Sequence, residues 1–218
     1  MKRRTLDLLF SVGGVALAGL LLMLGMVMLS NANFAKTYVT TQLNEQNITF
    51  KTAATLTAEE KQSACLVKYA GQKLTTGKQA ECYANDFIGL HVKSVAGGKT
   101  YAELGDTQTQ LRTQAAAAKQ ANDPAAADLQ KQLDAVTAQR ETLFKGETLR
   151  GLLLTSYGFS EMGVKAGQAA VVSFAAAGVL FLLAIGGFVH AAVTPASKGF
   201  GVPDKADGTT PNRPMAKV

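Results

Sequence analysis

Two long apolar segments lie near the ends of the chain and frame a polar middle. From Leu8 to Leu29 there are 22 consecutive residues without a charge, and Ala166 to Val189 gives 24 residues whose only strongly polar member is Gln168. A helix rises about 1.5 Å per residue, so each segment can cross the roughly 30 Å hydrocarbon core of a bilayer. Lipid offers the backbone no hydrogen bonds, which favours helices. We therefore expect membrane-spanning helices at 8–30 and 166–193.

Both segments have competing interpretations. Either could be the buried core helix of a globular domain. The first could also be a cleaved signal peptide, because Lys2, Arg3 and Arg4 precede it and residues 30–32 read Ser-Asn-Ala. A signal core usually spans 7–15 residues, and this one is longer, which favours an uncleaved anchor.

The basic residues predict the orientation of the two spans. Lys2, Arg3 and Arg4 stand directly before the first apolar segment and favour a cytoplasmic N-terminus (1–7). A second span returns the chain to the same side, so the tail at 194–218 is expected in the cytoplasm. Its Gly/Pro/polar composition predicts disorder there. Residues 31–165 are then expected outside the cytoplasmic membrane.

Small residues recur at every fourth position of both apolar segments: Gly14 and Ala18 on the first, and Ala169, Ser173 and Ala177 on the second. Such faces let two backbones approach closely in lipid. Two interpretations stay open: the two helices pack on each other, or one face docks on a larger partner. Neither segment has an ionisable residue at its centre, which argues against ion or proton transport.

Helical signals fill the first half of the middle region. A T-x-x-E capping box at Thr57 predicts a helix to about Leu74, and Gly77 is suited to a left-handed cap. Apolar residues then recur at helical spacing from Lys78 to Val95. We expect a helical hairpin at 58–95, preceded by an irregular or weakly extended stretch at 33–57.

Three further segments lead to the second span. Thr100 and Glu103 form another capping box, which predicts a helix at 100–120, and Asp123-Pro124 is a start signal for a helix at 124–145. We expect an antiparallel hairpin of these two, too short for a sustained coiled coil. Residues 146–163 are apolar but short, and we expect an interfacial segment there. The fold class is thus all-α, with two transmembrane helices around a helical extracytoplasmic domain.

Cys65 and Cys82 are the only cysteines. They fall in the expected extracytoplasmic region, where disulfides persist. A uniform helical wheel places Cys82 opposite the apolar stripe of its helix. A structural disulfide, two free thiols and an intermolecular bond all stay open. No C-x-x-C motif occurs, which argues against a redox role.

Catalytic and metal-binding patterns are sparse. His91 and His190 are the only histidines, and the expected topology places them on opposite sides of the bilayer, so they cannot share a metal. The chain contains no H-E-x-x-H, G-x-S-x-G or phosphate-loop motif. We expect no enzyme, no cofactor and no metal site. The net charge of +6 forms no block and there is no Trp, so we expect no nucleic-acid binding.

Several strings resemble a family of small actinobacterial membrane proteins that often carry the label "aromatic ring-opening dioxygenase". They are the start MKRRTLDLL, Tyr69–Gly71 followed by Thr75-Thr76-Gly77 and Gln79-Ala80, AGGKTYAE at 96–103, GETLRGLLL at 146–154 and GFVH at 187–190. The resemblance covers residues 1 to about 193. It implies membership of an envelope protein family and assigns no catalytic residue.

These observations favour a non-catalytic accessory or scaffold protein of the bacterial plasma membrane. Its partners would be the lipid bilayer and either a larger membrane complex, respiratory complexes included, or further copies of itself. The alternative is an extracytoplasmic sensor that holds a small molecule or lipid. Its pocket would be lined by Tyr69, Tyr83 and His91.

Overall fold

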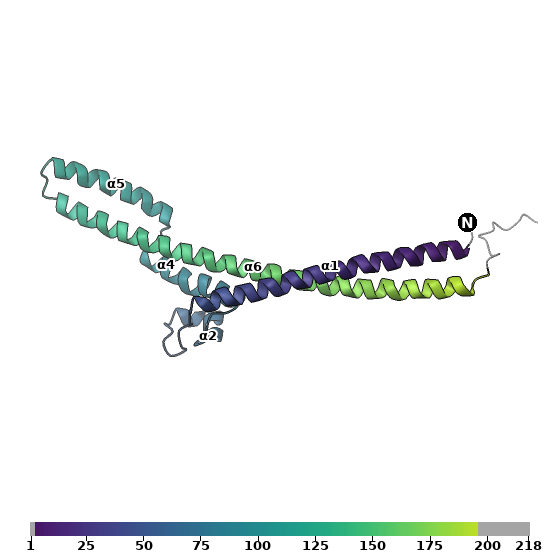
Figure 1. Cartoon of the computed structure of the whole chain (residues 1–218). Helices are drawn as coiled ribbons and strands as arrows, with labels where there is room; N and C mark the ends of the chain where they lie inside the picture. Colours follow the sequence, from purple (N-terminus) through teal and green to yellow (C-terminus); the bar gives the residue numbers. More distant parts are fainter. Residues whose placement is uncertain (1–2, 196–218) are drawn as a thin grey trace, which may run out of the picture. The chain divides into compact units, whose positions relative to one another are not determined.

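The computed structural model describes residues 3–195, and the secondary-structure elements of the described chain are all helical (Figure 1). The elements in order are α1 (Arg3–Glu45), the 3-10 turn η1 (Glu60–Gln62), α2 (Ala64–Tyr69), α3 (Gly77–Cys82), the π-helical turn η2 (Tyr83–Ile88), α4 (Gly89–Val95), α5 (Tyr101–Gln120) and α6 (Ala126–Val193). Within 3–195, β structure is limited to one isolated bridge between Thr49 and Lys73. Two long apolar helices flank a small helical middle region, as the sequence predicts. The tail expected at 194–218 lies, from residue 196 onward, outside the described residues.

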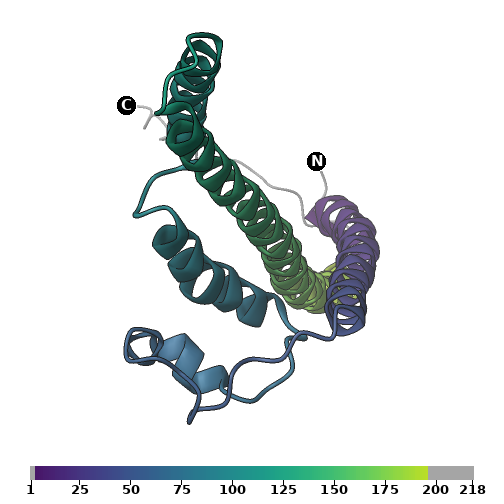
Figure 2. The ribbon, with the colours of Figure 1, turned by 90° about the vertical axis from the view of Figure 1, so that its left-hand side faces the viewer.

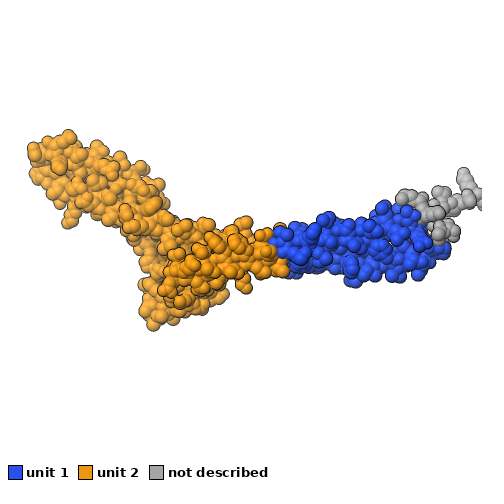
Figure 3. Space-filling model, in the orientation of Figure 1, with its two compact units in different colours: residues 1–27, 169–218 blue, residues 28–168 orange. Residues whose placement is uncertain are grey.

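The chain divides into two compact units (Figure 3). Described residues 3–27 and 169–195 form the first unit, and residues 28–168 form the second. Both α1 and α6 contribute to both units.

The first unit is an antiparallel pair formed by the start of α1 and the end of α6 (Figure 1). A Cβ on Gly14 would lie 3.4 Å from the Cβ of Ala184, and a Cβ on Gly25 would lie 2.6 Å from the ring of Phe174. The inward positions alternate in steps of four and three on both helices. On α1 they are Asp7, Ser11, Gly14, Ala18, Leu21 and Gly25, and on α6 they are Ala170, Ser173, Ala177, Leu180, Ala184, Gly187 and Ala191. A seven-residue repeat of this kind is typical of left-handed helix pairs.

Both long helices qualify as membrane spans by length and composition. Only 11% of the apolar 18-residue stretch of α1, and 22% of that of α6, is buried within the protein. The core helix of a globular domain buries most of its apolar side chains, so this exposure argues against the core-helix alternative. Two candidate transmembrane helices indicate a membrane location.

The second unit has its core where α1 and α6 meet the middle helices. The fully or nearly fully buried apolar residues are Val39, Leu43, Phe50, Leu56, Leu66, Leu74, Ala80, Cys82, Ala84, Ile88 and Leu153. Figure 2 shows the α3–η2–α4 segment running beside α6. Glycines permit this close approach: a Cβ on Gly77 would lie 2.6 Å from Ser160 Oγ, and one on Gly146 would lie 2.5 Å from Val92.

Capping boxes set the local starts of the middle helices. The Thr57 hydroxyl accepts the Glu60 N–H while the Glu60 carboxylate accepts the Thr57 N–H, as predicted, although the result is the short turn η1. Thr100 and Glu103 cap α5 in the predicted way. A third box, Thr76 with Gln79, starts α3. Each box satisfies backbone N–H groups that the first helical turn leaves unpaired.

Several predicted boundaries differ from the observed helices. The sequence predicts an irregular or weakly extended stretch at 33–57, yet α1 continues to Glu45. A helix that already exists extends at little cost, and burial of Val39 and Leu43 favours it. The first helix of the hairpin at 58–95 is reduced to η1 and α2. Gly77 is the first residue of α3 and not a left-handed cap; among the glycines of the described chain, the positive φ angles belong to Gly71, Gly97 and Gly98.

The longest difference concerns the end of the described chain. The helix expected at 124–145, the segment at 146–163 and the apolar helix at 166–193 form one continuous helix, α6. Leu153 of the expected interfacial segment is buried in the core of the second unit. The segment at 146–163 therefore packs partly against other helices of the protein.

The α5–α6 hairpin is the second antiparallel helix pair. Its inward residues also follow steps of four and three: Leu104, Gln108, Leu111, Ala115 and Ala118 on α5, and Leu129, Leu133, Val136, Arg140 and Leu143 on α6. Gln108 Nε2 donates to the Thr137 hydroxyl at 2.7 Å, and the Arg140 guanidinium stacks 4.1 Å from the centre of the Tyr101 ring. The pair spans about two heptads, consistent with the expected short hairpin.

Candidate functional site

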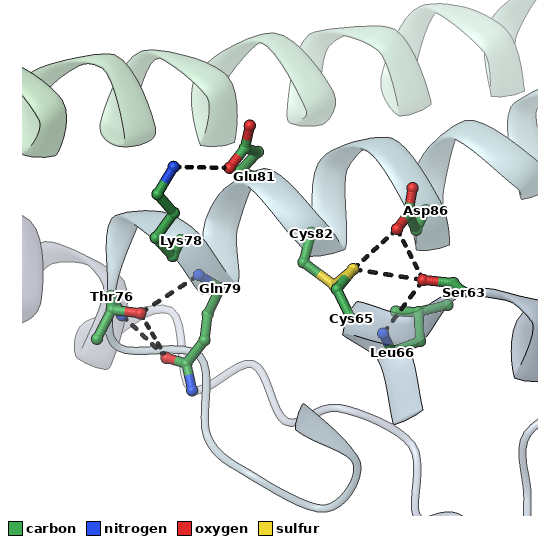
Figure 4. Close-up of a disulfide and its surroundings, with 9 residues drawn as sticks. All are labelled: Ser63, Cys65, Leu66, Thr76, Lys78, Gln79, Glu81, Cys82 and Asp86. Carbon is green, nitrogen blue, oxygen red and sulfur yellow. Dashed lines mark hydrogen bonds and ion pairs between the residues drawn. A yellow bond between two sulfur atoms is a disulfide. The ribbon is translucent and has the colours of Figure 1, made fainter. Parts of the chain in front are cut away.

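Cys65 on α2 and Cys82 at the end of α3 form a disulfide, with Cα atoms 6.0 Å apart (Figure 4). Of the three alternatives that the sequence leaves open, the structural bridge is the one observed. Cys82 is only 5% exposed. The bridge ties the α2 segment to the α3–η2–α4 segment across 17 positions of sequence.

The π-helical turn η2 explains why a helical wheel misplaces Cys82. The wheel assumes 3.6 residues per turn from Lys78 to Val95, but residues Tyr83–Ile88 are wound in a wider π turn. Ala80 and Cys82 before the turn, and Ala84 and Ile88 within it, therefore all face the core. Residues 83–88 contain no Gly or Pro that would indicate such a turn.

Asp86 and Ser63 lie directly beside the disulfide (Figure 4). The Ser63 hydroxyl donates to the Asp86 carboxylate at 2.7 Å and accepts the Leu66 N–H at 3.2 Å, which caps α2. Asp86 Oδ2 also lies 2.8 Å from Cys65 Sγ. Cys65, Cys82 and Asp86 are close enough to form a ligand cluster. However, a disulfide sulfur is not a thiolate, so in this state the cluster acts as a structural joint.

Glu60 is an almost completely buried carboxylate, 2% exposed, beneath α4. Lys51 Nζ donates to it at 2.7 Å, and the Thr57 N–H donates at 2.8 Å. Burial raises the pKa of the Glu60 carboxyl, but the hydrogen bonds from Lys51 and Thr57 outweigh it, so that the pKa lies below its ordinary value. His91 Nε2 lies 3.9 Å away. Glu60 therefore anchors the loop before α2 as an anion.

The three expected pocket residues belong to a continuous row of rings. Ring centres are 5.6 Å apart for Phe50–Tyr69, 5.3 Å for Phe50–Tyr83, 4.6 Å for Tyr83–Phe87 and 4.5 Å for Phe87–His91. Burial raises the pKa of the Tyr83 hydroxyl. Tyr69 borders a hollow of about 450 Å³ beside the disulfide, and His91 borders one of about 110 Å³ beside Glu60. The structure does not bring all three side chains to one cavity.

A different cavity, which we call the apolar groove, lies between α1 and α6 in the second unit. Its volume is about 490 Å³, within the usual range for ligand sites. Its lining is Tyr38, Val39, Gln42, Leu43, Gln46, Ile48, Leu149, Leu152, Leu153, Thr155, Ser156 and Phe159. None of these side chains is ionisable except the tyrosine. The sequence did not predict this groove, because the first helix was expected to end at residue 30 and residues 146–163 were expected to form a separate interfacial segment.

The expected helix-packing residues all belong to the first unit, and most of them lie in the contact between α1 and α6. Ala18 and Ala177 are almost fully buried, at 2% and 1% exposed, and Ser173 is 8% exposed. Gly14 faces Ala184. Ala169 is exposed, and its neighbour Ala170 takes the inward position. The small residues thus pair α1 with α6, the first of the two interpretations.

The two histidines lie in different units of the chain. His190 Nδ1 lies 2.9 Å from the Asp7 carboxylate in the first unit. His91, in the second unit, donates from Nδ1 to the Phe87 carbonyl at 2.7 Å. The described contacts bring neither histidine into a cluster of metal-ligating side chains.

Fold and contacts together define a class: a helical protein with two candidate membrane spans and a disulfide-held middle region. Comparisons with protein-family models, curated proteins and solved structures gave no match. The family resemblance seen in the sequence therefore stays a prediction, and the function has to be argued from the chain's own residues.

Proposed function

We propose that this protein is a non-catalytic accessory protein of the bacterial plasma membrane that docks on a larger membrane complex. Both termini would lie in the cytoplasm, and residues 31–165 would lie outside. The observation that carries the proposal is the α5–α6 hairpin, which is stabilised by contacts between its own two helices. Its other side presents short side chains, including Thr109, Thr113 and Ala116.

The packing of the membrane helices directs docking toward this hairpin. The small residues at the inward positions of α1 and α6 pack within the chain, so this face is not free to receive a partner's helix. The hairpin face has little side-chain entropy to lose when it is covered, because Thr and Ala have few rotamers. Arg112 adds one exposed guanidinium that can pair with a partner's carboxylate.

Site-specific photo-crosslinking in native membranes tests this proposal. A photoreactive phenylalanine at position 109, 112 or 116 is expected to capture one and the same protein, recovered in a fixed ratio after mild-detergent purification. A probe at the exposed Thr148 of α6 serves as the control and should not capture it. Recovery of the protein alone, or only with further copies of itself, would exclude the accessory function.

The apolar groove favours a second candidate function, the binding of a lipid or other apolar ligand. Leu149 and Leu152 on its rim are 40% and 62% exposed, and the aromatic side chains of Phe34, Tyr38 and Phe159 cluster at one end with ring centres 5.7–6.2 Å apart. Rings of this kind are enriched at membrane interfaces. Native mass spectrometry should then show a co-purified ligand that Ser156→Trp displaces and Thr148→Trp does not. Equal retention by both variants would contradict this candidate.

A further inference from the structure

A further cavity of the second unit lies between α4, the start of α5 and α6. We call it the basic cavity; its volume is about 630 Å³. Its lining is Asn85, Gly89, Leu90, Val92, Lys93, Gly98, Lys99, Thr100, Tyr101, Ala102, Leu143, Glu147 and Arg150. Three of these side chains are cationic and one is anionic, so the lining carries a formal excess of positive charge.

The donors of Arg150 are only weakly paired within the protein. Its guanidinium donates from Nη2 to Asn85 Oδ1 and from Nη1 to Glu147 Oε2, each at 3.3 Å, which is long for such bonds. Its Nε atom is buried and has no hydrogen-bond partner among the described residues. A buried donor without a partner costs about 1–3 kcal/mol, so native structures rarely leave one unpaired without a reason.

Other donors and apolar walls surround the same space. The first N–H groups of a helix have no partner within the helix, and Tyr101 and Ala102 at the start of α5 line the cavity. Lys93 and Lys99 approach from α4 and from the turn before α5, while Leu90, Val92 and Leu143 provide apolar surface. Glu103 lies outside the lining, because its carboxylate caps Thr100.

We infer that the basic cavity binds a small amphiphilic anion, with a phosphate or carboxylate group held by Arg150 and Lys99 and an apolar part against Leu90 and Leu143. The headgroup of a bilayer lipid is the less suitable source of that anion. Arg150 lies 16 residues before Ala166 on one helix, which corresponds to roughly 24 Å along its axis. A soluble ligand can reach the cavity from the aqueous side.

Calorimetry on the full chain in nanodiscs of phosphatidylcholine tests the inference, with hexyl phosphate as the probe. We expect saturable 1:1 binding that weakens with added salt, weaker binding of inorganic phosphate, and no binding of hexanol. The variant Arg150→Gln should lose about tenfold or more in affinity, as expected for a charge-assisted hydrogen bond. Lys131→Gln removes a charge on the exposed surface of α6 and should bind like the wild type.

Two variants separate a specific contact from general attraction. Arg150→Lys keeps the charge but removes the planar pair of Nη donors, so it should also lose affinity, whereas Lys99→Arg should retain it. Equal binding by the wild type, Arg150→Gln and Arg150→Lys would overturn the inference, as would equal binding of hexanol and hexyl phosphate. A third outcome is that hexyl phosphate does not bind, and the protein binds only anionic lipid that replaces phosphatidylcholine in the nanodisc. In that case a bilayer headgroup is the ligand and the soluble source is wrong.

Discussion

The long helix α6 forms two antiparallel pairs that share one repeat and differ in chemistry. Its beginning pairs with α5 through Leu129, Leu133 and Val136, together with the polar contacts of Arg140. Its end pairs with α1 through Ala170, Ala177, Ala184 and Ala191. Both pairs repeat in steps of four and three, so the repeat alone specifies that the helices pair along their length.

The different residue types follow from the surroundings expected for each pair. In water, burial of leucine and valine provides the stabilising free energy. Between helices in lipid that contribution is missing, because lipid tails are as apolar as the side chains, and close van der Waals contact of small residues replaces it. The comparison teaches that the spacing of residues determines which helices pair, whereas their size and polarity reflect the solvent.

The largest expected effect belongs to neither pair but to the middle region that joins them. Replacing both cysteines in Cys65→Ser/Cys82→Ser should lower the free energy of unfolding by about 3 kcal/mol, because a loop of this length is no longer constrained in the unfolded chain. Chemical denaturation of the purified protein measures it. Wild-type protein under reductant should match the variant, and the variant itself should not respond to reductant.

The membrane pair can be broken by adding bulk. Gly25→Leu should destabilise it by about 1–3 kcal/mol, because the new side chain meets the ring of Phe174. Gly19→Leu is the matched control: it lies on the same helix with nothing within 4 Å of its added Cβ, and it gains the same helix propensity. Thermal unfolding in detergent compares the two. Equal melting temperatures would contradict the close packing of α1 on α6.

The middle region should respond to acid through Glu60. The pKa of its carboxyl is lower in the folded chain than its ordinary value of 4.5. Its stabilising contribution is therefore present above about pH 4.5 and is lost as the pH falls through the folded-state pKa. Glu60→Gln should cost about 1.5 kcal/mol at pH 7 and flatten this acid dependence. Glu59→Gln changes the neighbouring exposed carboxyl, and the same flattening in that variant would argue against Glu60 as the source.

The smallest expected effect lies in the α5–α6 hairpin. Arg140→Ala removes the ring contact with Tyr101 and the hydrogen bond to its carbonyl, which should cost about 1 kcal/mol. Hydrogen exchange of the α5 amides should accelerate about fivefold in consequence. Arg112→Ala removes an exposed guanidinium from α5 and should change exchange little. Faster exchange in α1 as well would show that the hairpin is not an independent element.

Much of the architecture is determined by the sequence alone. Two uncharged segments of 22 and 24 residues predict the long apolar helices, and the T-x-x-E boxes at Thr57 and Thr100 predict where local turns begin. Both signals act over a few residues or through simple length, so they do not depend on how distant parts meet. The pairing of Cys65 with Cys82 was one of three possibilities and could not be selected from spacing.

Tertiary packing decided the remainder. Residues 33–45 and 146–163 are helical because burial of Val39, Leu43 and Leu153 between segments far apart in sequence outweighs weak local preference. The π turn at Tyr83–Ile88 rotates one part of a helix relative to the next, which brings Cys82 inward to its partner. The apolar groove and the basic cavity each combine residues from separate helices. Cavities are enclosed only when elements distant in sequence pack together, so no local sequence pattern could have predicted them.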